Sequence, residues 1–350
     1  MWMREFGTTA KGEKAVIYTI KNKQGMMAEV SDFGATLVSL FVPDEKGKLR
    51  DVVLGYDSPE YYEGSSKTFF GVTVGRNSNR IADGRFVLNG ITYQLDQNNK
   101  GNNLHSGFDF YSFRIWNVKE KSENSITFIL HSPDGDQGYP GTVDVEISYT
   151  LTEDNGVKID YSAKPDKDTI LNLTNHSFFN LNGHDSGSVL GQTLWMDADA
   201  FTPTDHRLIP TGEIAAVVGT PMDFRKRKTI GRDIQADYEP LRMTGGYDHN
   251  WCLNNRGTFA KVIEMHADES GITMEVYTDL PGVQIYAGTY LKDEHGKGGN
   301  FYGAYQGICF ETQGYPDAVH HENFPSTVCK KGETYHSTTI YRFSVAMKSS

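Results

Sequence analysis

The sequence is dominated by short stretches in which apolar and polar residues alternate, and this pattern restricts the fold more than any other feature. Such stretches occupy residues 14–42, 85–95 and 143–161. Alternation with a period of two sends every second side chain to the same face of a strand, so these stretches predict β-strands with one buried face. Asn-Gly pairs at positions 89–90 and 155–156 lie between alternating runs, where this dipeptide is the strongest short-range signal for a hairpin turn.

Helices contribute little to the expected fold. No amphipathic run is long enough for a sizeable helix, and only residues 230–236 indicate a short one. The 36 glycines, 19 tyrosines and 19 phenylalanines suit strands joined by tight turns. Because no linker or internal repeat divides the chain, we predict a single domain over residues 1–350, an all-β sandwich or barrel.

The charge of the chain restricts its partners. The formal net charge is −11, so no chain-wide basic face is available to nucleic acid or to an anionic membrane. A local basic cluster at residues 225–228 does not alter that balance. We therefore expect a neutral small molecule as the ligand rather than a polyanion.

Cysteine usage and the N-terminal residues predict a cytoplasmic protein. Cys252, Cys309 and Cys329 are odd in number, far apart and not arranged as CxxC, so buried, reduced thiols are expected. Residues 1–7 lack the basic start and apolar core of a signal peptide. No window approaches the 18 uncharged apolar residues that a membrane span requires.

A carboxylate stands in the middle of an otherwise apolar strand near the end of the chain. In the predicted strand at residues 306–313, Ile308 and Phe310 point one way, and Glu311 and Gln313 point the other way. A buried glutamate is costly unless it is paired, hydrogen-bonded or needed as a base. The ordinary structural explanation is a surface glutamate on the solvated face of an edge strand.

His176 is the most suggestive partner for such a carboxylate. In the alternating segment 170–181 it shares a predicted face with Asn172 and Thr174, and Phe178 follows shortly after it. A half-buried histidine beside aromatic residues is often a hydrogen-bonded core residue. Imidazole is also the side chain whose proton affinity best suits acid–base chemistry near neutral pH.

Four further polar residues have both a structural and a functional interpretation. Arg80, in a glycine-rich turn, could be a turn clamp, and His105, in a Gly/Asn loop, could be a solvated loop residue. Asp248 could form an Asx turn, and Gln284, between Val283 and Ile285, could make a cross-strand hydrogen bond. If they gather in one place, they supply donors and acceptors for a polar ligand.

Motifs for metals, nucleotides and redox cofactors are missing. The adjacent His320 and His321 face apart on a strand, and neither CxxC nor HExxH occurs. The sequence also lacks a GxSxG elbow, a phosphate-binding glycine loop and a dinucleotide fingerprint. We therefore predict proton transfer on a polyhydroxylated ligand without a metal or other cofactor.

Several motifs, in the same order along nearly the whole chain, resemble the galactose mutarotase (aldose 1-epimerase) family. They are GRNSNRI at residues 75–81, NLH at 103–105, NLTNHSFFNL at 172–181, PTDHRLIPTG at 203–212, YDHN at 247–250, GVQIY at 282–286, FETQ at 310–313 and FPS at 324–326. One such string would be a weak signal, whereas eight in order are a specific one.

The resemblance implies a fold and an activity. The fold is a large antiparallel β-sandwich, often called a supersandwich. The activity is interconversion of the α- and β-anomers of galactose, glucose and related aldoses by a cofactor-independent isomerase, as a monomer or a homodimer. By resemblance, Glu311 is the general base for the C1 hydroxyl, His176 is the general acid for the ring oxygen, and His105 assists. The resemblance also implies the residues that hold the sugar hydroxyls: Asn79, Arg80, Asp248 and Gln284.

Departures from the family pattern concern substrate preference. Ser106 and Gly107 follow His105 where the family usually has Gly-Gly, which would reshape that loop slightly. Gly314 and Tyr315 lie where relatives vary, and together with residues 225–228 they leave the preferred sugar open. The acid, the base and His105 all match the family.

Three alternative functions follow from the same residues. A hexose-6-phosphate 1-epimerase on this fold would need a basic pocket near C6, and the motifs supply only Arg80. A sugar-binding protein that has lost catalysis would not need to keep both Glu311 and His176. A glycosidase would need a second carboxylate as the partner of Glu311, whereas the evident partner is a histidine.

Overall fold

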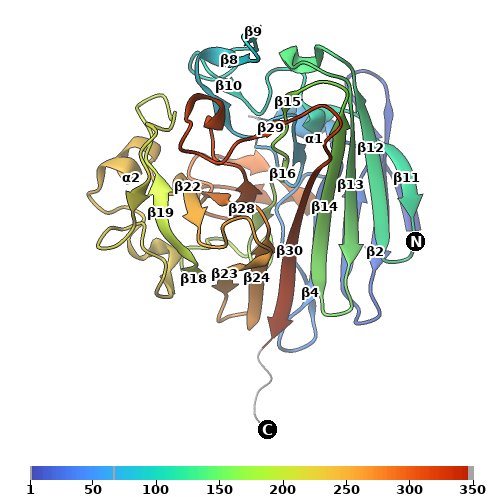
Figure 1. Cartoon of the computed structure of the whole chain (residues 1–350). Helices are drawn as coiled ribbons and strands as arrows, with labels where there is room; N and C mark the ends of the chain where they lie inside the picture. Colours follow the sequence, from blue (N-terminus) through green and yellow to red (C-terminus); the bar gives the residue numbers. More distant parts are fainter. Residues whose placement is uncertain (1, 66–67, 346–350) are drawn as a thin grey trace.

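The protein is described by a computed structural model that covers residues 2–65 and 68–345. Within these residues, every pairing between two strands is antiparallel, and three sheets contain most of the strands. In Figure 1 the long strands β12, β13, β14 and β30 run side by side in one half of the molecule, and β19 and β22 lie in the other half. The prediction of an all-β architecture is confirmed.

The largest sheet has nine strands. In spatial order they are β11 (Asn117–Lys121), β12 (Ser125–Ser132), β13 (Val143–Leu151), β14 (Gly156–Pro165), β30 (Tyr335–Val345), β24 (Ile272–Thr278), β23 (Ala260–His266), β18 (Thr193–Met196) and β21 (Lys228–Thr229). Buried residues alternate with more exposed ones along β13 and β14, as expected for a sheet with one packed face.

A second sheet, of six strands, contains Glu311, the glutamate that was predicted to be the general base. Its spatial order is β17 (Phe178–Phe179), β28 (Ile308–Gln313), β25 (Gly282–Tyr286), β22 (Asp248–Leu253), β19 (Ala198–Thr202) and β20 (Ala215–Ala216). Strand β28 lies between β17 and β25, and all six of its residues are buried. Glu311 is therefore on an interior strand, and its interpretation as a solvated residue of an edge strand is wrong.

A five-stranded sheet packs against the nine-stranded one. It consists of β1 (Trp2–Thr8), β2 (Lys14–Lys21), β3 (Met27–Ser31), β4 (Thr36–Pro43) and β5 (Leu49–Asp51). The shorter strands are β6 (Thr73–Val74), β7 (Arg80–Ile81), β8 (Arg85–Leu88), β9 (Ile91–Gln94), β10 (Asn103–Leu104), β15 (Thr169–Ile170), β16 (Thr174–Asn175), β26 (Glu294–His295), β27 (Phe301–Tyr302) and β29 (Val328–Cys329).

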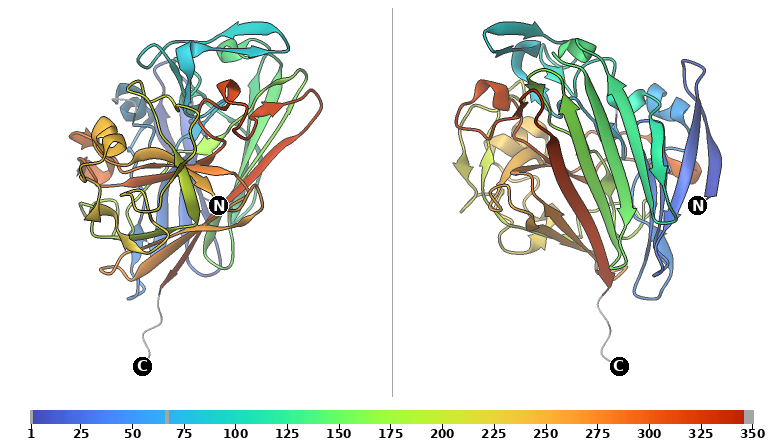
Figure 2. Two further views of the ribbon diagram at one scale, coloured as in Figure 1. Left: turned by 60° about the vertical axis from the view of Figure 1, so that its left-hand side comes forward. Right: turned by 45° about the vertical axis from the view of Figure 1, so that its right-hand side comes forward.

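The hydrophobic core lies between these three sheets, which the two views of Figure 2 show from the side. One continuous cluster joins buried side chains from all of them: Ile20, Val145, Tyr341, Trp251 and Phe310. This cluster buries the apolar face of β28, so the opposite face of the strand carries Cys309 and Glu311.

Both predicted Asn-Gly hairpins are confirmed. Asn89 and Gly90 join β8 to β9, with φ of 52° and 76°, as the type I′ turn requires. Asn155, with a φ of 61°, joins β13 to β14.

The predicted short helix at residues 230–236 is only partly correct. A single 3₁₀ turn covers Ile230–Arg232, and the α-helix that follows is α2 (Glu239–Thr244). That helix has a proline in its first turn, where the missing N–H costs no hydrogen bond, and it ends at Gly245 in the left-handed region. The other α-helix of the described residues is α1 (Pro59–Gly64), and neither helix has the length or apolar character to cross a membrane.

The prediction of one continuous strand over residues 170–181 is wrong. Three two-residue strands replace it: β15, β16 and β17. Asn175 Oδ1 accepts hydrogen bonds from the backbone N–H and the hydroxyl of Ser177, and this side-chain turn interrupts the strand. Because β16 pairs with β6 and β17 pairs with β28, His176 lies where the chain passes from one sheet to another.

Candidate active site

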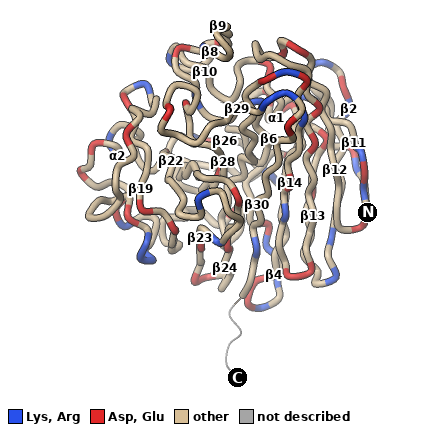
Figure 3. Tube along the Cα trace, viewed as in Figure 1, with Lys and Arg blue, Asp and Glu red and all other residues tan. Residues whose placement is uncertain are grey.

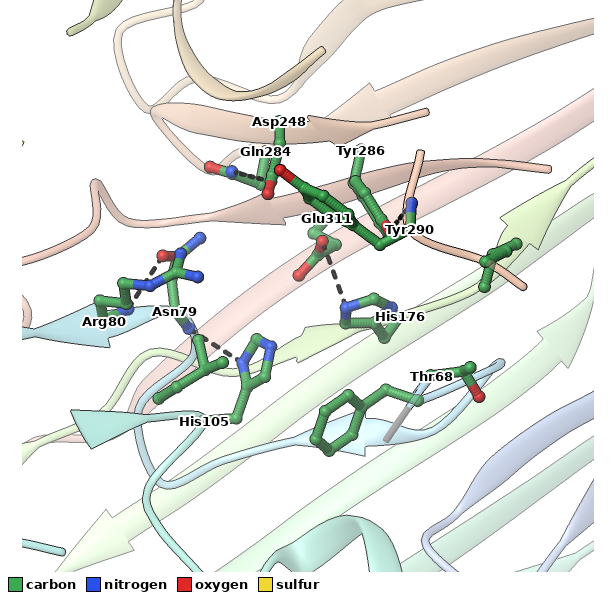
Figure 4. A pocket seen from close by; sticks show the side chains of 13 residues that line it. Thr68, Asn79, Arg80, His105, His176, Asp248, Gln284, Tyr286, Tyr290 and Glu311 are labelled. Carbon is green, nitrogen blue, oxygen red and sulfur yellow. Dashed lines mark hydrogen bonds and ion pairs between the residues drawn. The ribbon is translucent and has the colours of Figure 1, made fainter. Parts of the chain in front are cut away.

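The seven site residues predicted from the sequence lie around one pocket (Figure 4). They are Asn79, Arg80, His105, His176, Asp248, Gln284 and Glu311. The space in and directly in front of the pocket is about 690 Å³, which includes open solvent. Every one of these side chains except Asp248 is buried, although the segments that carry them are far apart in the sequence.

Three neighbouring strands of the six-stranded sheet form one wall. Gln284 on β25 is directly opposite Glu311 on β28, and Asp248 on β22 pairs with Tyr286 on β25. The Gln284 amide N–H donates to Asp248 Oδ1 at 2.8 Å. Strand alternation therefore brings an acid, an amide and a second acid to the same face of the sheet.

The opposite wall is formed by two loops that hold each other. Asn79 and His105 both have a positive φ, of 62° and 54°. The Asn79 backbone N–H donates to His105 Nδ1 at 3.1 Å, and the His105 backbone N–H donates to the Asn79 carbonyl at 3.0 Å. These reciprocal hydrogen bonds fix the direction of the His105 ring and place the adjacent Arg80 at the pocket.

Ser106, where the family usually has glycine, strengthens this contact. Its hydroxyl accepts from the Asn77 backbone N–H at 2.8 Å and donates to the Asn77 carbonyl at 3.0 Å. The hydroxyl also lies 3.3 Å from the Tyr139 hydroxyl. Ser106 therefore ties the His105 loop to the segment that carries Asn79 and Arg80.

Glu311 and His176 form a buried pair. His176 Nε2 lies 3.4 Å from Glu311 Oε1, and the other carboxylate oxygen has no hydrogen-bond partner among the described residues. Burial raises the pKa of the Glu311 carboxyl well above its usual value, the negative charge of Asp248 raises it further, and Arg80 opposes the shift. A carboxylate with a raised pKa is a stronger base than a free glutamate.

Aromatic rings surround both imidazoles. The Phe69 ring lies 5.0 Å from the His105 ring and 5.7 Å from the His176 ring, and Phe178 stacks on His176 at 5.4 Å. Burial lowers the pKa of His176 to about 4, against the opposing charge of Asp248. Burial also lowers the pKa of His105, and the positive charges of His176 and Arg80 lower it further.

Two imidazoles and a carboxylate could in principle bind a divalent metal. The ligand atoms of His105, His176 and Glu311 lie within 4.8 Å of one another. However, His105 Nδ1 accepts the Asn79 N–H, so the neutral ring carries its proton on Nε2, and that nitrogen has no lone pair for a metal. The pocket therefore offers His105 Nε2 as a hydrogen-bond donor.

Arg80 supplies the positive charge of the pocket. Its Nε donates to Asn99 Oδ1 at 3.2 Å, and its side chain is buried. The basic cluster at residues 225–228 does not line the pocket. Its ion pairs are with nearby acids: Arg225 with Asp199 and Asp223, Arg227 with Glu264, and Lys228 with Asp233. Figure 3 shows that acidic and basic residues are interspersed along the whole trace.

Six further residues that line the pocket were not predicted as site residues from the sequence: Thr68, Phe69, Leu104, Tyr286, Tyr290 and Leu291. Phe69 has a φ of 59°, which is rare for a bulky residue, and it touches both imidazoles. Neither property leaves a signal in the local sequence. Gly314 and Tyr315, which seemed relevant to substrate preference, are not among the residues that line the pocket.

Comparisons with known proteins identify the family of the chain. The sequence model of the aldose 1-epimerase family matches residues 16–342. The chain is 42% identical to galactose mutarotase from Bos taurus over 323 residues, which cover 92% of each protein. It is 39% identical to aldose 1-epimerase from Haemophilus influenzae, over 93% of this chain and 95% of that one.

The chain belongs to the aldose 1-epimerase family. Its fold matches the crystal structure of the aldose epimerase homologue from C. elegans with a TM-score of 0.85 and 30% identity, over 94% of this chain and 99% of that one. The predicted galactose mutarotase-like fold and the predicted activity, that of an aldose 1-epimerase and so of an isomerase, are confirmed.

Proposed function

We propose that Glu311 and His176 catalyse the interconversion of the α- and β-anomers of galactose, glucose and related aldoses as general base and general acid. The observation that carries this proposal is the 3.4 Å contact between two buried titratable groups, His176 and Glu311, that line one pocket. Strongly perturbed pKa values of buried groups in a pocket are typical of catalytic acids and bases.

The reaction needs proton transfers at two oxygens of one pyranose. Glu311 takes the proton of the C1 hydroxyl while the bond from C1 to the ring oxygen breaks, and its electron pair goes to the ring oxygen. His176 Nε2 gives its proton to that oxygen, and a carbonyl forms at C1. Rotation about the C1–C2 bond presents the other face of the aldehyde, and the same two residues return the protons as the ring closes.

The remaining residues hold the sugar. His105 Nε2–H and the Arg80 guanidinium donate to hydroxyl or ring oxygens, and the Asp248 carboxylate and the buried Gln284 Oε1, which has no partner among the described residues, accept from hydroxyls. The side chain of Asn79 shapes the turn, since its Oδ1 accepts the Arg80 backbone N–H at 2.9 Å. Fixed donors and acceptors of this kind orient a small polar ligand for reaction.

Polarimetry of freshly dissolved α-galactose tests the proposal. We expect the wild type to speed the return to anomeric equilibrium, and Glu311→Gln and His176→Asn each to lose roughly 10²–10⁴-fold in kcat. A Glu311→Gln protein as fast as the wild type would exclude this mechanism. Galactose, glucose, xylose and arabinose measured together would give the order of preference.

The pocket disfavours the alternatives. A hexose 6-phosphate needs positive charge near C6, yet Arg80 is accompanied in the pocket by two acids, Asp248 and Glu311. A glycosidase needs two catalytic carboxylates. Here the group that lies 3.4 Å from Glu311 is the imidazole of His176, and the other carboxylate, that of Asp248, accepts a hydrogen bond from Gln284. Faster turnover of glucose 6-phosphate than of glucose would reverse the first conclusion.

We also propose that residues 1–350 form one domain that acts in the cytoplasm as a monomer or a homodimer. The continuous core that joins the three sheets supports a single domain. The three buried free cysteines support a reducing compartment. Light scattering of the purified protein would distinguish a monomer from a dimer.

A further inference from the structure

Cys309 lies against the nitrogen of His176 that does not face Glu311. Its Sγ is 3.6 Å from His176 Nδ1, and the side chain is completely buried. Cys309 and Glu311 are two positions apart on β28, so both project from the same face of one strand. The two ring nitrogens of His176 are therefore contacted by two side chains of a single strand: Nε2 by Glu311 and Nδ1 by Cys309.

From this arrangement we propose that Cys309 is a positioning residue, whose sulfur accepts a hydrogen bond from His176 Nδ1–H and so keeps Nε2 as the nitrogen that exchanges protons with the sugar. The inference rests on the proposed role of His176 as general acid. In an imidazole, the hydrogen bond made by one nitrogen decides the protonation of the other. Cys309 acts through His176 and does not line the pocket.

The protonation states of His176 during the reaction support a hydrogen bond in which Nδ1–H donates and the Cys309 sulfur accepts. In the form of the pair that opens the ring, Glu311 is a carboxylate and His176 is an imidazolium, so Nδ1–H needs an acceptor. After Nε2 has given up its proton, Nδ1 still carries its own, and Nε2 can accept from the Glu311 carboxyl at 3.4 Å or from the ring-opened sugar hydroxyl. The sulfur lone pairs serve as the acceptor in both states, so no rearrangement at Nδ1 accompanies the reaction.

Sulfur also suits the acidity that the site requires. A carboxylate at Nδ1 would stabilise the imidazolium and make it a weaker acid, whereas a thiol is a weak acceptor. Burial raises the pKa of the Cys309 thiol well above its ordinary value, and the negative charges of Glu311 and Asp248 raise it further, so the group stays a neutral thiol. A thiolate, which would act on His176 as a carboxylate does, is thereby avoided.

The matched experiment compares Cys309→Val, Cys309→Ser and Cys329→Val. Valine fills the space of the thiol without an acceptor, serine restores an acceptor, and Cys329 is a buried free cysteine outside the pocket. We expect Cys309→Val to lower kcat about tenfold with little change in KM, as for other residues that orient a histidine through its second nitrogen. Cys309→Ser should recover most of this loss, and Cys329→Val should keep the wild-type kcat.

A spectroscopic measurement separates positioning from mere packing. In ¹⁵N-histidine-labelled wild type at neutral pH, we expect His176 Nδ1 to be protonated and Nε2 unprotonated, and we expect Cys309→Val to populate the opposite tautomer. The acid limb of the pH–rate profile should move in Cys309→Val alone. The titratable and charged groups that face His176 and Cys309, which the variants must leave unchanged, are Arg80, His105, Asp248, Tyr286, Glu311 and Tyr341.

Two results would overturn the inference: an unprotonated Nδ1 on His176 in the wild type, or equal kcat values for Cys309→Val and the wild type. The first needs no variant, so it decides the question even if Cys309→Val does not fold. Failure of the proposed catalytic role of His176 can be told apart from failure of the Cys309 inference, because only the former would give His176→Asn full activity. If His176→Asn is inactive and Nδ1 is unprotonated, only the role of Cys309 is wrong.

Discussion

His176 Nε2 lies 3.4 Å from Glu311 Oε1, and the two side chains are only 7% and 3% exposed. Burial disfavours the charged form of each group, so it raises the pKa of the carboxyl and lowers that of the imidazole. Over a broad range of pH the two residues therefore share one proton. During ring opening His176 gives a proton to the sugar and Glu311 takes one from it, and ring closure reverses both transfers. The pair therefore carries one proton before and after each step, and the singly protonated pair is the active form in both directions.

The first prediction is a bell-shaped dependence of kcat/KM on pH. On the acid side the rate should fall as the pair binds a second proton, near the His176 pKa of about 4. On the alkaline side the rate should fall as the pair loses its remaining proton, above the ordinary pKa of a glutamate because burial raises that of Glu311. The two limbs belong to the coupled pair rather than to either residue.

Initial polarimetric rates, corrected for spontaneous mutarotation in each buffer, would measure this profile. A fall in kcat/KM on the acid side that is centred on pH 6.5, the ordinary pKa of a histidine, would contradict the lowered pKa of the buried His176. His176→Asn is the control, because its residual activity should lack the limb near pH 4.

The second prediction is that Glu311→Gln stabilises the protein. The folded-state pKa of Glu311 is raised above its unfolded value, so its contribution to stability is fully present below the unfolded pKa and is lost as the pH rises through the folded pKa. Gln cannot lose a proton and avoids this loss. We expect the free energy of unfolding of the variant to exceed that of the wild type by about 0.5–2 kcal/mol at neutral pH, the usual size of a stabilising substitution.

Urea denaturation at several pH values would check the prediction, and the difference should shrink toward zero at acid pH, where the wild-type carboxyl is protonated. A constant difference across the pH range would show that the effect is unrelated to ionisation. Glu275→Gln is a suitable control, because the pKa of that carboxyl is lowered and its ion pairs with Lys261 and Arg342 are lost on substitution.

The polar residues of the site could be predicted because they lie in strands or turns with distinctive sequences. Glu311 and Gln284 interrupt apolar strands, and Arg80 follows an Asn-rich turn. Their meeting in one pocket depends on the order β28-β25-β22 in the sheet, which local alternation does not encode. The family resemblance supplied that step.

Some contacts in the site could not be predicted, because the sequence around the residues that make them carries no distinctive motif. Phe69 is a phenylalanine before another phenylalanine, yet its left-handed backbone puts its ring against two imidazoles. The strand predicted through His176 ignored Asn175, whose side chain turns the backbone so that the chain changes sheets. Cys309 was expected only to be a buried thiol, and its position beside His176 follows from that change of sheet.

The third prediction concerns Ser106. Removing its hydroxyl in Ser106→Ala leaves the buried Asn77 N–H without its partner, which costs about 1–3 kcal/mol. Ser106→Gly loses the same bond but relieves the left-handed backbone, since the φ of Ser106 is 73°. Thermal unfolding should therefore give the order wild type, Ser106→Gly, Ser106→Ala from most to least stable. If Ser106→Ala were as stable as Ser106→Gly, the left-handed backbone at residue 106 would not be a source of strain, and this prediction would be wrong.

The fourth prediction is that divalent metals neither support nor inhibit the reaction through this pocket. His105 Nδ1 accepts the Asn79 N–H, so its Nε2 is protonated and cannot be a ligand, which leaves His176 and Glu311 as an incomplete set. We expect dialysis against EDTA to leave the rate unchanged, and calorimetric titration with Zn²⁺ to give the same result for the wild type and His105→Ala. One zinc ion per wild-type chain, displaced by galactose and absent from His105→Ala, would mean that the His105 ring can turn over and release the Asn79 N–H.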